Sequence, residues 1–497
     1  MSECILVIDQ GTTGSTAAYF DRETLRLLAN AKVEFPQHFP RPGWVEHSPG
    51  EIWTSITTAI KQAGEKLGLT GRQGAVVAIG VTNQRETVVA WNRRSGEIAC
   101  PAIVWQDRRT ADFCAQLDAD SGTQKMIRRK TGLVCDPYFS ASKMHWILEH
   151  SDVARAWAAR GDLAFGTIDS YVMYQLSGQR EFVTDHTNAS RTMLYDLERG
   201  NYDEDLLKLF GVSRGALAEI RPSAGLFGTT RGVPGIVDGV PIMGCLGDQQ
   251  AALFGHECDG PGYGKVTYGT GAFYLLNTGG VPRWSESGLL TSVAYSDNTG
   301  RTFAIEGSTF IAGAAVQFLR DNFKWFNEAR ESEALALSAP RDEHVVFVPA
   351  LAGLGAPYWN PHAKGALLGL TRGTSRAQIT RAVLESIALQ IVQLHRAAMS
   401  GSSEKLIRLG VDGGASRSEF LMQFQADVLR TELARPENIE TTAKGAARAA
   451  RRGLDPSDQR PSTEPNTIFH PAMPLDESNR IAERWLRAVA AVDALVH

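Results

Sequence analysis

The sequence predicts an α/β fold with two large domains, and three observations support this prediction. The chain has 497 residues, which is too long for one ordinary hydrophobic core. Apolar, strand-like runs alternate with helical patterns in both halves, as in layered α/β proteins. A glycine-containing turn follows the first strand and has a counterpart near residue 268, which suggests a duplicated architecture. Glycine and proline gather at residues 250–260, so we predict domains at 1–253 and 254–497.

The first half begins with a predicted meander. Residues 3–9 (ECILVID) and 16–21 (TAAYFD) read as strands on either side of a tight turn, and 25–35 would add a third strand. SPGE at 48–51 is a capping box with proline at the first helical position, so a helix should follow to about residue 66. Residues 75–82 form a continuous apolar run typical of a buried strand, and helical patterns dominate from 107 to 177.

The second half repeats the alternation of strands and helices. Residues 263–279 predict a hairpin with a Gly-Thr-Gly turn, and 344–357 predict a strand that enters a glycine-rich loop. A long helix is predicted at 376–398. Residues 406–416 predict a strand with a glycine-rich exit, followed by a helix over 418–430.

The composition is that of a globular protein and excludes several functional classes. Hydrophobic residues make up 43% and charged residues 21%, with a formal net charge of -4. This charge gives no reason to expect nucleic acid or an anionic membrane as a partner, and no apolar stretch approaches the ~20 residues of a membrane span. The six cysteines form no C-x-x-C pair, and no basic leader precedes the first strand. We therefore expect a cytoplasmic protein with no membrane insertion.

Residues 8–16 (IDQGTTGST) are the first candidate for chemistry. Asp9 ends a buried strand, and residues 11–13 form a turn rich in backbone N–H groups and hydroxyls. Such a turn can hold phosphate oxygens, and the carboxylate can hold magnesium through water. It is no Walker loop, and an ordinary hairpin turn is an equal alternative. Two similar turns at 268–273 and 411–416 favour the hypothesis that three turns surround one nucleotide.

Other candidates flank predicted strands and helices. Arg85 and Glu86 follow an apolar strand and could bracket vicinal hydroxyls, although a surface salt bridge is the alternative. Trp105 and Tyr138 lie beside polar clusters, but their pattern alone favours the core over a ligand wall. Asp248 precedes an apolar run, and this pattern alone favours a helix cap over a catalytic role.

Twelve segments, distributed from about residue 5 to 450, share one resemblance: IDQGTT, PGWVEH, TNQRET, IVWQDRR, TGLVCDPYFSASK, VTDHTNASRTML, GDQQAALFG, YGTGAF, GLGAPYW, GLTRG, LESIALQ and VDGGA. In this order they resemble the FGGY family of carbohydrate kinases, and residues 138–150 and 365–385 resemble its two signatures. The combination of WQ-x-RR, TNQRET and GDQQAALFG is similar to the members that act on glycerol rather than on xylulose or ribulose. The resemblance implies two actin-like ATPase (ribonuclease H-like) domains with an interdomain cleft that closes on substrate.

The resemblance also implies an activity and a role for particular residues. The expected reaction is ATP-dependent phosphorylation of glycerol to sn-glycerol 3-phosphate, in glycerol uptake and catabolism, with ATP and Mg²⁺ as cofactors. Asp248 would be the catalytic base, and Asp9 and Asp248 would lie at the metal. The residues implied to hold glycerol are Arg85, Glu86, Trp105, Tyr138, Asp248, Gln249 and Phe273. Those implied to contact the nucleotide are Thr12, Thr13, Gly14, Thr270, Gly313, Gln317, Gly414 and Ser418.

The sequence departs from the family pattern at four places. Gly14 and Thr16 stand where a phosphate-contacting Ser and a nucleotide-reaching Arg are usual, and Ser418 replaces an adenine-contacting Asn. These changes predict weaker or less selective nucleotide binding. Residues 230–241 lack the loop by which some bacterial members bind fructose 1,6-bisphosphate, so we expect that inhibition to be absent or weak. In the predicted helix at 441–453, cationic residues replace the apolar residues that are usual in the family. We expect these side chains to form a solvent-exposed face rather than a binding patch: Lys444, Arg448, Arg451 and Arg452.

Three alternatives to the glycerol-specific enzyme stay open. One is a family kinase for another polyol or ketose, which the set of Arg85, Glu86 and Trp105 disfavours. A second is an actin- or Hsp70-like ATPase, which would need no base with a triol-binding set. The third is a non-catalytic nucleotide-dependent regulator, which the missing Arg at 16 and Asn at 418 keep open. The resemblance further suggests a homo-oligomer, either a dimer or a tetramer.

Overall fold

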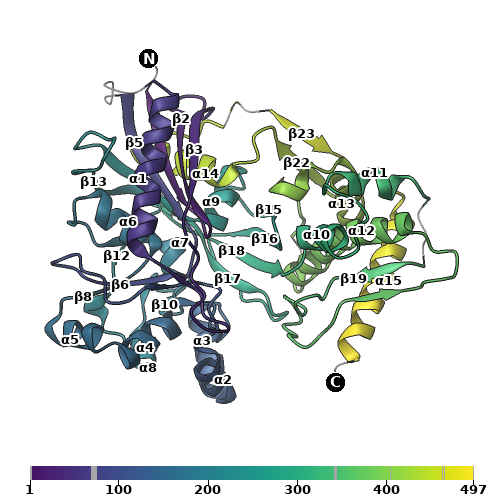
Figure 1. Cartoon of the computed structure of the whole chain (residues 1–497), viewed down its shortest axis with the longest axis horizontal. Coiled ribbons are helices and arrows are strands. Elements are labelled where there is room, and N and C mark those ends of the chain that lie inside the picture. Colours follow the sequence, from purple (N-terminus) through teal and green to yellow (C-terminus); the bar gives the residue numbers. More distant parts are fainter. Residues whose placement is uncertain are drawn as a thin grey trace.

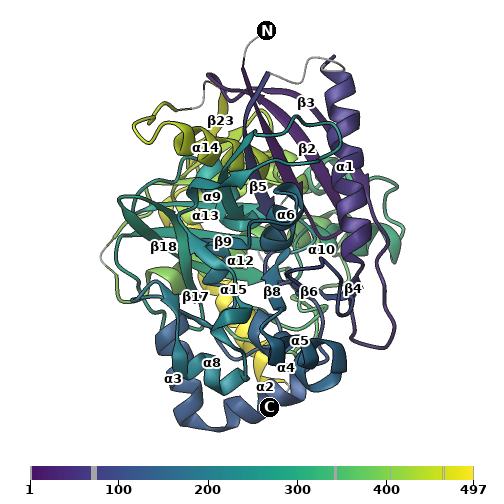
Figure 2. The ribbon, with the colours of Figure 1, turned by 90° about the vertical axis from the view of Figure 1, so that its left-hand side faces the viewer.

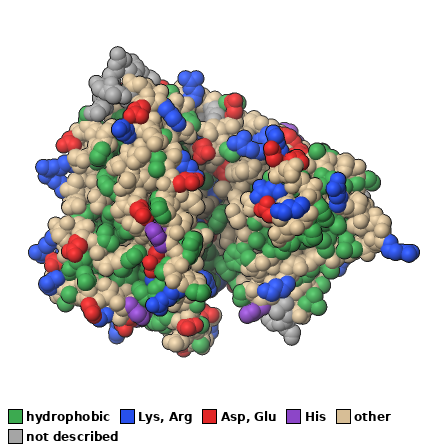
Figure 3. All heavy atoms as spheres, in the orientation of Figure 1, with side chains coloured by type: hydrophobic (Ala, Val, Ile, Leu, Met, Phe, Trp, Pro, Cys, Tyr) green, Lys and Arg blue, Asp and Glu red, His purple; other side chains and the backbone are tan. Residues whose placement is uncertain are grey.

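The computed structural model describes residues 3–68, 75–340, 344–402, 404–461, 463 and 465–495. The molecule has two lobes, with the N-terminal strands in one and the C-terminal helix in the other (Figure 1). Figure 3 shows a groove between the two lobes on this face of the molecule. No helix in the described residues is long and apolar enough to cross a membrane.

A six-stranded sheet forms the centre of the first lobe, in the order β13-β14-β5-β1-β2-β3. Its strands are β1 (Cys4–Gln10), β2 (Gly14–Asp21), β3 (Leu27–Glu34), β5 (Val76–Asn83), β13 (Ala224–Thr229) and β14 (Pro241–Gly247). The predicted meander is confirmed, because β1 pairs with β2 and β2 with β3, both antiparallel. Strands β1, β5 and β14 run parallel, which brings their carboxyl ends to one edge of the sheet.

Both faces of this sheet are covered, which explains why β1 reads as a continuous apolar run. Leu6 and Ile8 pack into the core cluster that contains α1 (Pro49–Lys66) and α6 (Ile168–Leu176). Ile5 and Val7 point the other way, toward alanines of α14 (Thr441–Leu454). Figure 2 shows α1 alongside β2 and β3. Ser48 caps α1 by accepting a hydrogen bond from the Glu51 N–H group, as predicted, whereas the Glu51 carboxylate lies 3.0 Å from His38 Nε2 and does not complete the predicted capping box.

The remaining elements of the first lobe build its lower part around a four-stranded sheet in the order β4-β7-β6-β8. These strands are β4 (Glu46–His47), β6 (Val88–Asn92), β7 (Ala102–Ile103) and β8 (Leu163–Thr167), and two small pairs are formed by β9 (Val183–Asp185) with β12 (Glu219–Arg221) and by β10 (Tyr195–Asp196) with β11 (Asn201–Tyr202). The helices are α2 (Ala111–Ala119), α3 (Ser121–Thr131), α4 (Ser140–His150), α5 (Asp152–Arg160), α7 (His186–Ala189), α8 (Glu204–Phe210) and the 3₁₀ turn η2 (Arg214–Ala216).

The second lobe contains a seven-stranded sheet in the order β17-β18-β16-β15-β21-β22-β23. Its strands are β15 (Tyr263–Tyr268), β16 (Ala272–Gly279), β17 (Leu290–Asp297), β18 (Gly300–Thr309), β21 (Arg408–Asp412), β22 (Glu432–Pro436) and β23 (Asn466–Phe469), and β19 (Val346–Val348) pairs separately with β20 (Ala366–Leu368). The helices are α10 (Gly313–Asp321), α11 (Glu331–Leu337), α12 (Arg376–Met399), η3 (Gly414–Arg417), α13 (Glu419–Leu429) and α15 (Leu475–Ala494). The predicted hairpin over 263–279 is confirmed as β15 and β16.

Two helices cross where the lobes meet: α9 (Asp248–Gly255) and α14. A side chain at Gly445 would collide with the carbonyl oxygen of Ala251, and one at Gly255 with that of Thr441. The two helix backbones therefore touch directly. This crossing joins the first lobe's sheet, on which α14 packs, to the chain that continues into the second lobe.

The prediction that the cationic residues of α14 form a solvated face was wrong for three of the four. Lys444 is 6% exposed, Arg448 is 6% exposed and Arg451 is 2% exposed, while Arg452 is half-buried. The reason is that α9, β13, β14 and β5 surround this helix. The arginine side chains extend from the helix to carboxylates, with Arg451 Nε lying 3.0 Å from Asp458.

Candidate active site

Strand register gathers the candidate residues at one edge of the first lobe's sheet. Gln10 at the end of β1 pairs with Asn83 at the end of β5, and Gly247 at the end of β14 pairs with Asn83 on the other side. In open α/β sheets, ligands bind outside these carboxyl ends. The chemistry-bearing residues at or just beyond these three strand ends are Asp9, Arg85, Glu86 and Asp248.

Asp9 lies beside the turn of residues 11–13 and keeps its carboxylate available. Its side chain makes no hydrogen bond or ion pair with any described residue. Burial raises the pKa of Asp9 to about 7, with smaller contributions from the negative charges of Asp248 and Glu440. Asp9 and Asp248, which are far apart in the chain, therefore feel each other's charge across the sheet edge.

Arg85 and Glu86 are buried, so the surface salt bridge considered for them is wrong. Arg85 is 3% exposed and Glu86 is 1% exposed. Arg85 donates to Glu306 at 2.8 Å, and Arg191 donates to Glu86 at 2.6 Å and also to Glu306. Two guanidinium groups thus alternate with two carboxylates, which neutralises the charge of the buried cluster.

Glu86 has an unusual backbone conformation. Its φ angle is 63°, in the left-handed region that non-glycine residues rarely adopt. Such strain persists only where the surrounding structure fixes it, and it is concentrated at functional sites. Here the strained residue follows the end of β5 and turns its carboxylate toward Arg191.

Asp248 is the first residue of α9, as the sequence suggested, but its carboxylate does not cap this helix in the usual way. The N-cap is Gly247, and Asp248 Oδ1 accepts a 2.6 Å bond from the N–H group of Gln249. Arg85 Nε lies 3.3 Å from the same oxygen. Burial raises the pKa of Asp248, while Arg85 and Lys265 partly oppose this rise. The result is a carboxylate that is more basic than one in water.

Aromatic side chains surround the space beside Arg85. Tyr138, Phe273 and Trp359 line a small pocket together with Arg85 and Glu306. Trp105 packs edge-on against Tyr138, with 5.6 Å between the ring centroids, and the indole N–H donates to Thr12 at 3.0 Å. Trp105, Tyr138 and Phe273 are each half-buried. For Trp105 and Tyr138, whose pattern favoured the core, that prediction holds only in part, because Tyr138 packs against a core cluster and also lines the pocket.

Gln249 faces the second lobe. Its side-chain oxygen accepts a hydrogen bond from the Lys265 ammonium group, which also donates to Thr267 at 2.8 Å. Burial lowers the pKa of Lys265 to about 8, although Asp412 and Asp248 favour its charged form. Lys265 thus brings a positive charge from β15 close to Asp248.

The residues expected at the nucleotide come from both lobes. Thr12, Thr13 and Gly14 belong to the first turn, whereas Thr270, Gly313, Gln317, Gly414 and Ser418 belong to the second lobe. Within the second lobe the loops touch. The N–H group of Gly313 donates to the carbonyl of Gly269 at 3.0 Å, and a side chain at Gly413 would collide with the Tyr268 backbone. Thr270, Gln317 and Gly414 are exposed.

The Ser418 hydroxyl already has a hydrogen-bond partner within the second lobe. It is the N-cap of α13, and its hydroxyl accepts a 3.1 Å hydrogen bond from the N–H group of Leu421. A capping hydroxyl has less freedom to contact a base. Weaker adenine binding at position 418 therefore stays a prediction.

Both halves of the chain match models of one family. Residues 4–255 match the N-terminal domain, and residues 264–454 the C-terminal domain, of the FGGY family of carbohydrate kinases. The chain belongs to the FGGY family of carbohydrate kinases. It is 48% identical to a glycerol kinase of Myxococcus xanthus over 491 residues, which is 98% of each chain.

Solved structures support the same assignment. The crystal structure of Plasmodium falciparum glycerol kinase with ADP is 32% identical, covers 99% of this chain and 98% of its own, and superimposes with a TM-score of 0.92. A gluconate kinase from Lactobacillus acidophilus, at 20% identity and a TM-score of 0.88 over 100% of this chain and 99% of its own, shares the fold. The two lobes of this FGGY kinase therefore have the actin-like ATPase fold.

Sequence reasoning missed several residues of this FGGY kinase's site. Arg191 is fully buried and holds both Glu86 and Glu306, although it lies within the recognised segment VTDHTNASRTML. Glu306 is a single carboxylate in the apolar run of β18, and this isolation was a usable signal. Trp359 ends the recognised segment GLGAPYW, whereas Lys265 carried no comparable signal, because only the fold brings it to the site.

Proposed function

We propose that this FGGY kinase transfers the γ-phosphoryl group of ATP to glycerol and forms sn-glycerol 3-phosphate. The observation that carries this proposal is the position of Asp248. It lies 3.3 Å from Arg85, which lines a small aromatic pocket, and its charge acts on Asp9 beside the first turn. Near-full-length identity to proteins named glycerol kinase supports glycerol as the substrate.

Asp248 acts as the general base in this proposal. An alcohol is too weak an acid to ionise at neutral pH, so a carboxylate must accept its proton as the bond to phosphorus forms. Burial raises the pKa of Asp248, which makes it a better proton acceptor. Arg85, 3.3 Å away, keeps enough negative charge on the carboxylate for this role.

Glycerol binding is assigned to the cluster around Arg85 and Glu86. The guanidinium group donates and the carboxylate accepts, so one pair can bracket neighbouring hydroxyls. Trp105 and Phe273 would contact the carbon backbone, and Tyr138 and Gln249 would contact hydroxyls. A substrate that lacks a hydroxyl would leave a buried donor or acceptor unpaired, which favours a small triol.

Asp9 and Asp248 fit a magnesium ion by their chemistry. Both are carboxylates, Asp9 has no partner among the described residues, and their mutual repulsion would be relieved by a divalent cation. When bound, Mg²⁺ would neutralise charge on the ATP phosphates. The turn of residues 11–13 would hold phosphate oxygens, and Thr270, Gly313, Gln317 and Gly414 would contact the nucleotide from the second lobe.

The groove between the lobes has a role in this proposal. Water is itself a phosphoryl acceptor, so closure of the lobes over both substrates would limit wasteful hydrolysis. We also retain the predictions of a cytoplasmic location and of a homo-oligomer.

Replacement of Asp248 by Asn tests the proposal. Asp248→Asn should lower kcat by roughly 10²–10⁴-fold, because the amide cannot accept the proton, while glycerol binding and the thermal unfolding temperature change little. ADP release should be measured with Mg²⁺ and ATP, with glycerol, other polyols, pentuloses or no acceptor. The matched control is Asp321→Asn at an exposed aspartate.

The acceptor panel separates the remaining alternatives. Turnover that does not depend on glycerol would support an ATPase, and turnover with a pentulose alone would support another kinase of the family. An Asp248→Asn variant with the parent rate would refute the assignment of the base.

A further inference from the structure

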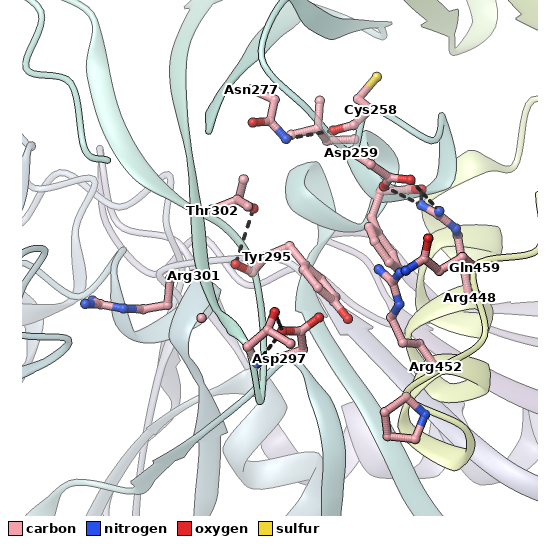
Figure 4. A pocket seen from close by; sticks show the side chains of 16 residues that line it. Cys258, Asp259, Asn277, Tyr295, Asp297, Arg301, Thr302, Arg448, Arg452 and Gln459 are labelled. Atoms are coloured by element: carbon pink, nitrogen blue, oxygen red, sulfur yellow. Dashed lines mark hydrogen bonds and ion pairs between the residues drawn. The ribbon is translucent and has the colours of Figure 1, made fainter. Parts of the chain in front are cut away.

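A second cavity is lined by residues of α9 and α14 and shares no lining residue with the proposed polyol pocket beside Arg85. It has a volume of about 490 Å³, which is within the range of metabolite sites. The end of α9, the β17–β18 hairpin, α14 and the loop that follows α14 form its walls (Figure 4). None of its lining residues belongs to the proposed site for glycerol or ATP.

One cationic group of this cavity is already neutralised. Arg448 donates to both oxygens of Asp259, at 2.7 and 2.5 Å, and to the carbonyl of Phe254 at 2.9 Å. Its guanidinium also lies 4.2 Å from the centre of the Phe254 ring. Arg448 and Asp259 therefore neutralise each other, and we assign them no role in binding an anion.

Arg452 follows one helical turn later, and Figure 4 shows its side chain directed into the cavity from α14. It forms no ion pair with any of the residues that the structure describes. Its guanidinium lies 5.9 Å from the centre of the Tyr295 ring and 6.0 Å from that of Phe254, and these two rings stack at 4.3 Å. A half-buried guanidinium held by aromatic rings is well suited to a planar anion.

Tyr295 provides a second sign of a ligand. The residue is 8% exposed, and its hydroxyl, which lies close to the Arg452 guanidinium, makes no hydrogen bond of good geometry with any described residue. Burial raises the pKa of Tyr295, an effect that Arg452 partly opposes, so the hydroxyl remains a donor at neutral pH. Buried polar groups without a partner are rare and mark places where something else binds.

Asp297 contributes an acceptor near the same hydroxyl. One of its oxygens accepts from the N–H group of Thr299 at 2.8 Å and from its hydroxyl at 2.5 Å. The neighbouring Arg301 does not neutralise it, because that guanidinium donates to Tyr195 and to the Leu197 carbonyl outside the cavity. A cation and an anion thus flank one phenol.

We propose that this cavity binds a small monocarboxylate that carries a hydrogen-bond donor next to the carboxylate. Arg452 and Tyr295 would hold the carboxylate, and Asp297 would accept from the donor, which is either a hydroxyl or an ammonium group. One unpaired guanidinium matches one negative charge, whereas a phosphate dianion would meet repulsion from Asp297. The polar walls and the volume suit a molecule of metabolite size.

Calorimetric titration of the full chain tests this site, with glycerol present throughout so that the polyol pocket is filled. D-glycerate and L-serine carry a hydroxyl or an ammonium group at the same carbon and identify the donor, while propionate has none. At least one of the first two should bind, and more tightly than propionate. Arg452→Gln should weaken this binding by at least about tenfold, and Asp297→Asn should remove the advantage over propionate.

The control is Arg487→Gln, which removes one positive charge from the exposed face of α15 and should leave the affinity unchanged. Thermal unfolding of each variant checks that it is folded. Equal affinity in the wild type and Arg452→Gln would overturn the proposal, as would no binding of any carboxylate. Tighter binding of ribose 5-phosphate than of the carboxylates would overturn the assignment of the ligand class.

Discussion

At the scale of single residues, buried charges in this protein have named partners, and the exceptions are informative. The buried cluster pairs two arginines with two glutamates: Arg85, Glu86, Arg191 and Glu306. These ion pairs offset part of the free-energy cost of removing the four charges from water. Asp9 has no partner of this kind among the described residues. A carboxylate left without a protein partner at the edge of a sheet is available to a ligand.

His47 should make stability depend on pH. Its Nε2 lies 2.7 Å from the Gln37 oxygen and its Nδ1 faces the Gln84 amide, an arrangement that suits the neutral ring. Burial, and then His38, lowers the pKa of His47 from 6.5 to about 4. The unfolded chain therefore takes up the proton first, and stability present above pH 6.5 is lost as the pH falls toward 4.

As the pH falls from 7 to 5, protonation of His47 in the unfolded chain should lower the free energy of unfolding by about 2 kcal/mol. His47→Gln should lower stability at pH 7 but flatten its decline toward pH 5. Urea unfolding at both pH values measures the difference, with His470→Gln as a control at an exposed histidine. Equal pH slopes in wild type and His47→Gln would contradict the argument.

A substitution at position 418 should change nucleotide binding and leave glycerol binding unchanged. Ser418→Asn keeps a side chain that can cap α13 and adds a longer donor and acceptor. We expect the KM for ATP to fall by about 2- to 10-fold, equivalent to roughly one hydrogen bond, while the KM for glycerol stays constant. Unchanged ATP and GTP kinetics would show that this position does not contact the base.

The sequence predicted many of these residues because motif segments lie where strands end. Asp9, Arg85 and Asp248 each follow an apolar run, and the parallel register of β1, β5 and β14 then brings them together. Glu306 and Lys265 could not be placed in the same way, because their neighbours come from the other lobe. For the cationic residues of α14, the charge pattern alone suggested water, whereas their partners Asp259 and Asp458 are supplied by chain that packs around the helix.

At the scale of elements, the crossing of α9 and α14 is the tightest contact between helices that sit at the junction of the lobes. It depends on glycine at both positions of closest approach, since any side chain there would meet backbone rather than a flexible group. Helix packing at this distance leaves no room to absorb an extra methyl group.

Gly445→Ala should therefore be costly although alanine favours helices. We expect a loss of stability of about 1–3 kcal/mol or more, and a lower kcat if closure depends on this crossing. Thermal unfolding and steady-state kinetics measure both effects. Gly50→Ala is the matched control, because it lies in α1 with only the Ser48 hydroxyl nearby, at 3.8 Å, and should be neutral or slightly stabilising.

At the scale of the whole molecule, the sheet of the second lobe reaches into the first. Glu306 on β18 binds Arg85 and Arg191, which belong to the first lobe, and Val293 and Phe303 pack with Ala189 in one apolar cluster. The proposed polyol pocket thus needs both lobes, and its charge balance depends on how the lobes sit together. Alternation of strands and helices predicted two α/β layers, but it contained no information about this contact.

Glu306→Gln should reveal that dependence. It removes one of two carboxylates from a pair of buried guanidinium groups, so Arg85 would lose its fixed orientation. We expect the KM for glycerol to rise by at least about tenfold, with a smaller change in kcat. Glu483→Gln, at an exposed position of α15, is the control. A variant that lowers kcat and leaves KM unchanged would argue against a positioning role.

The packing of α14 also has a consequence for synthesis on the ribosome. Ile5 and Val7 are synthesised more than 400 residues before the alanines that cover them, Ala446 and Ala447. At roughly 5–20 residues per second, this delay lasts tens of seconds. During that time one apolar face of the nascent first lobe has no native cover, and an exposed apolar face of this kind favours aggregation of the growing chain.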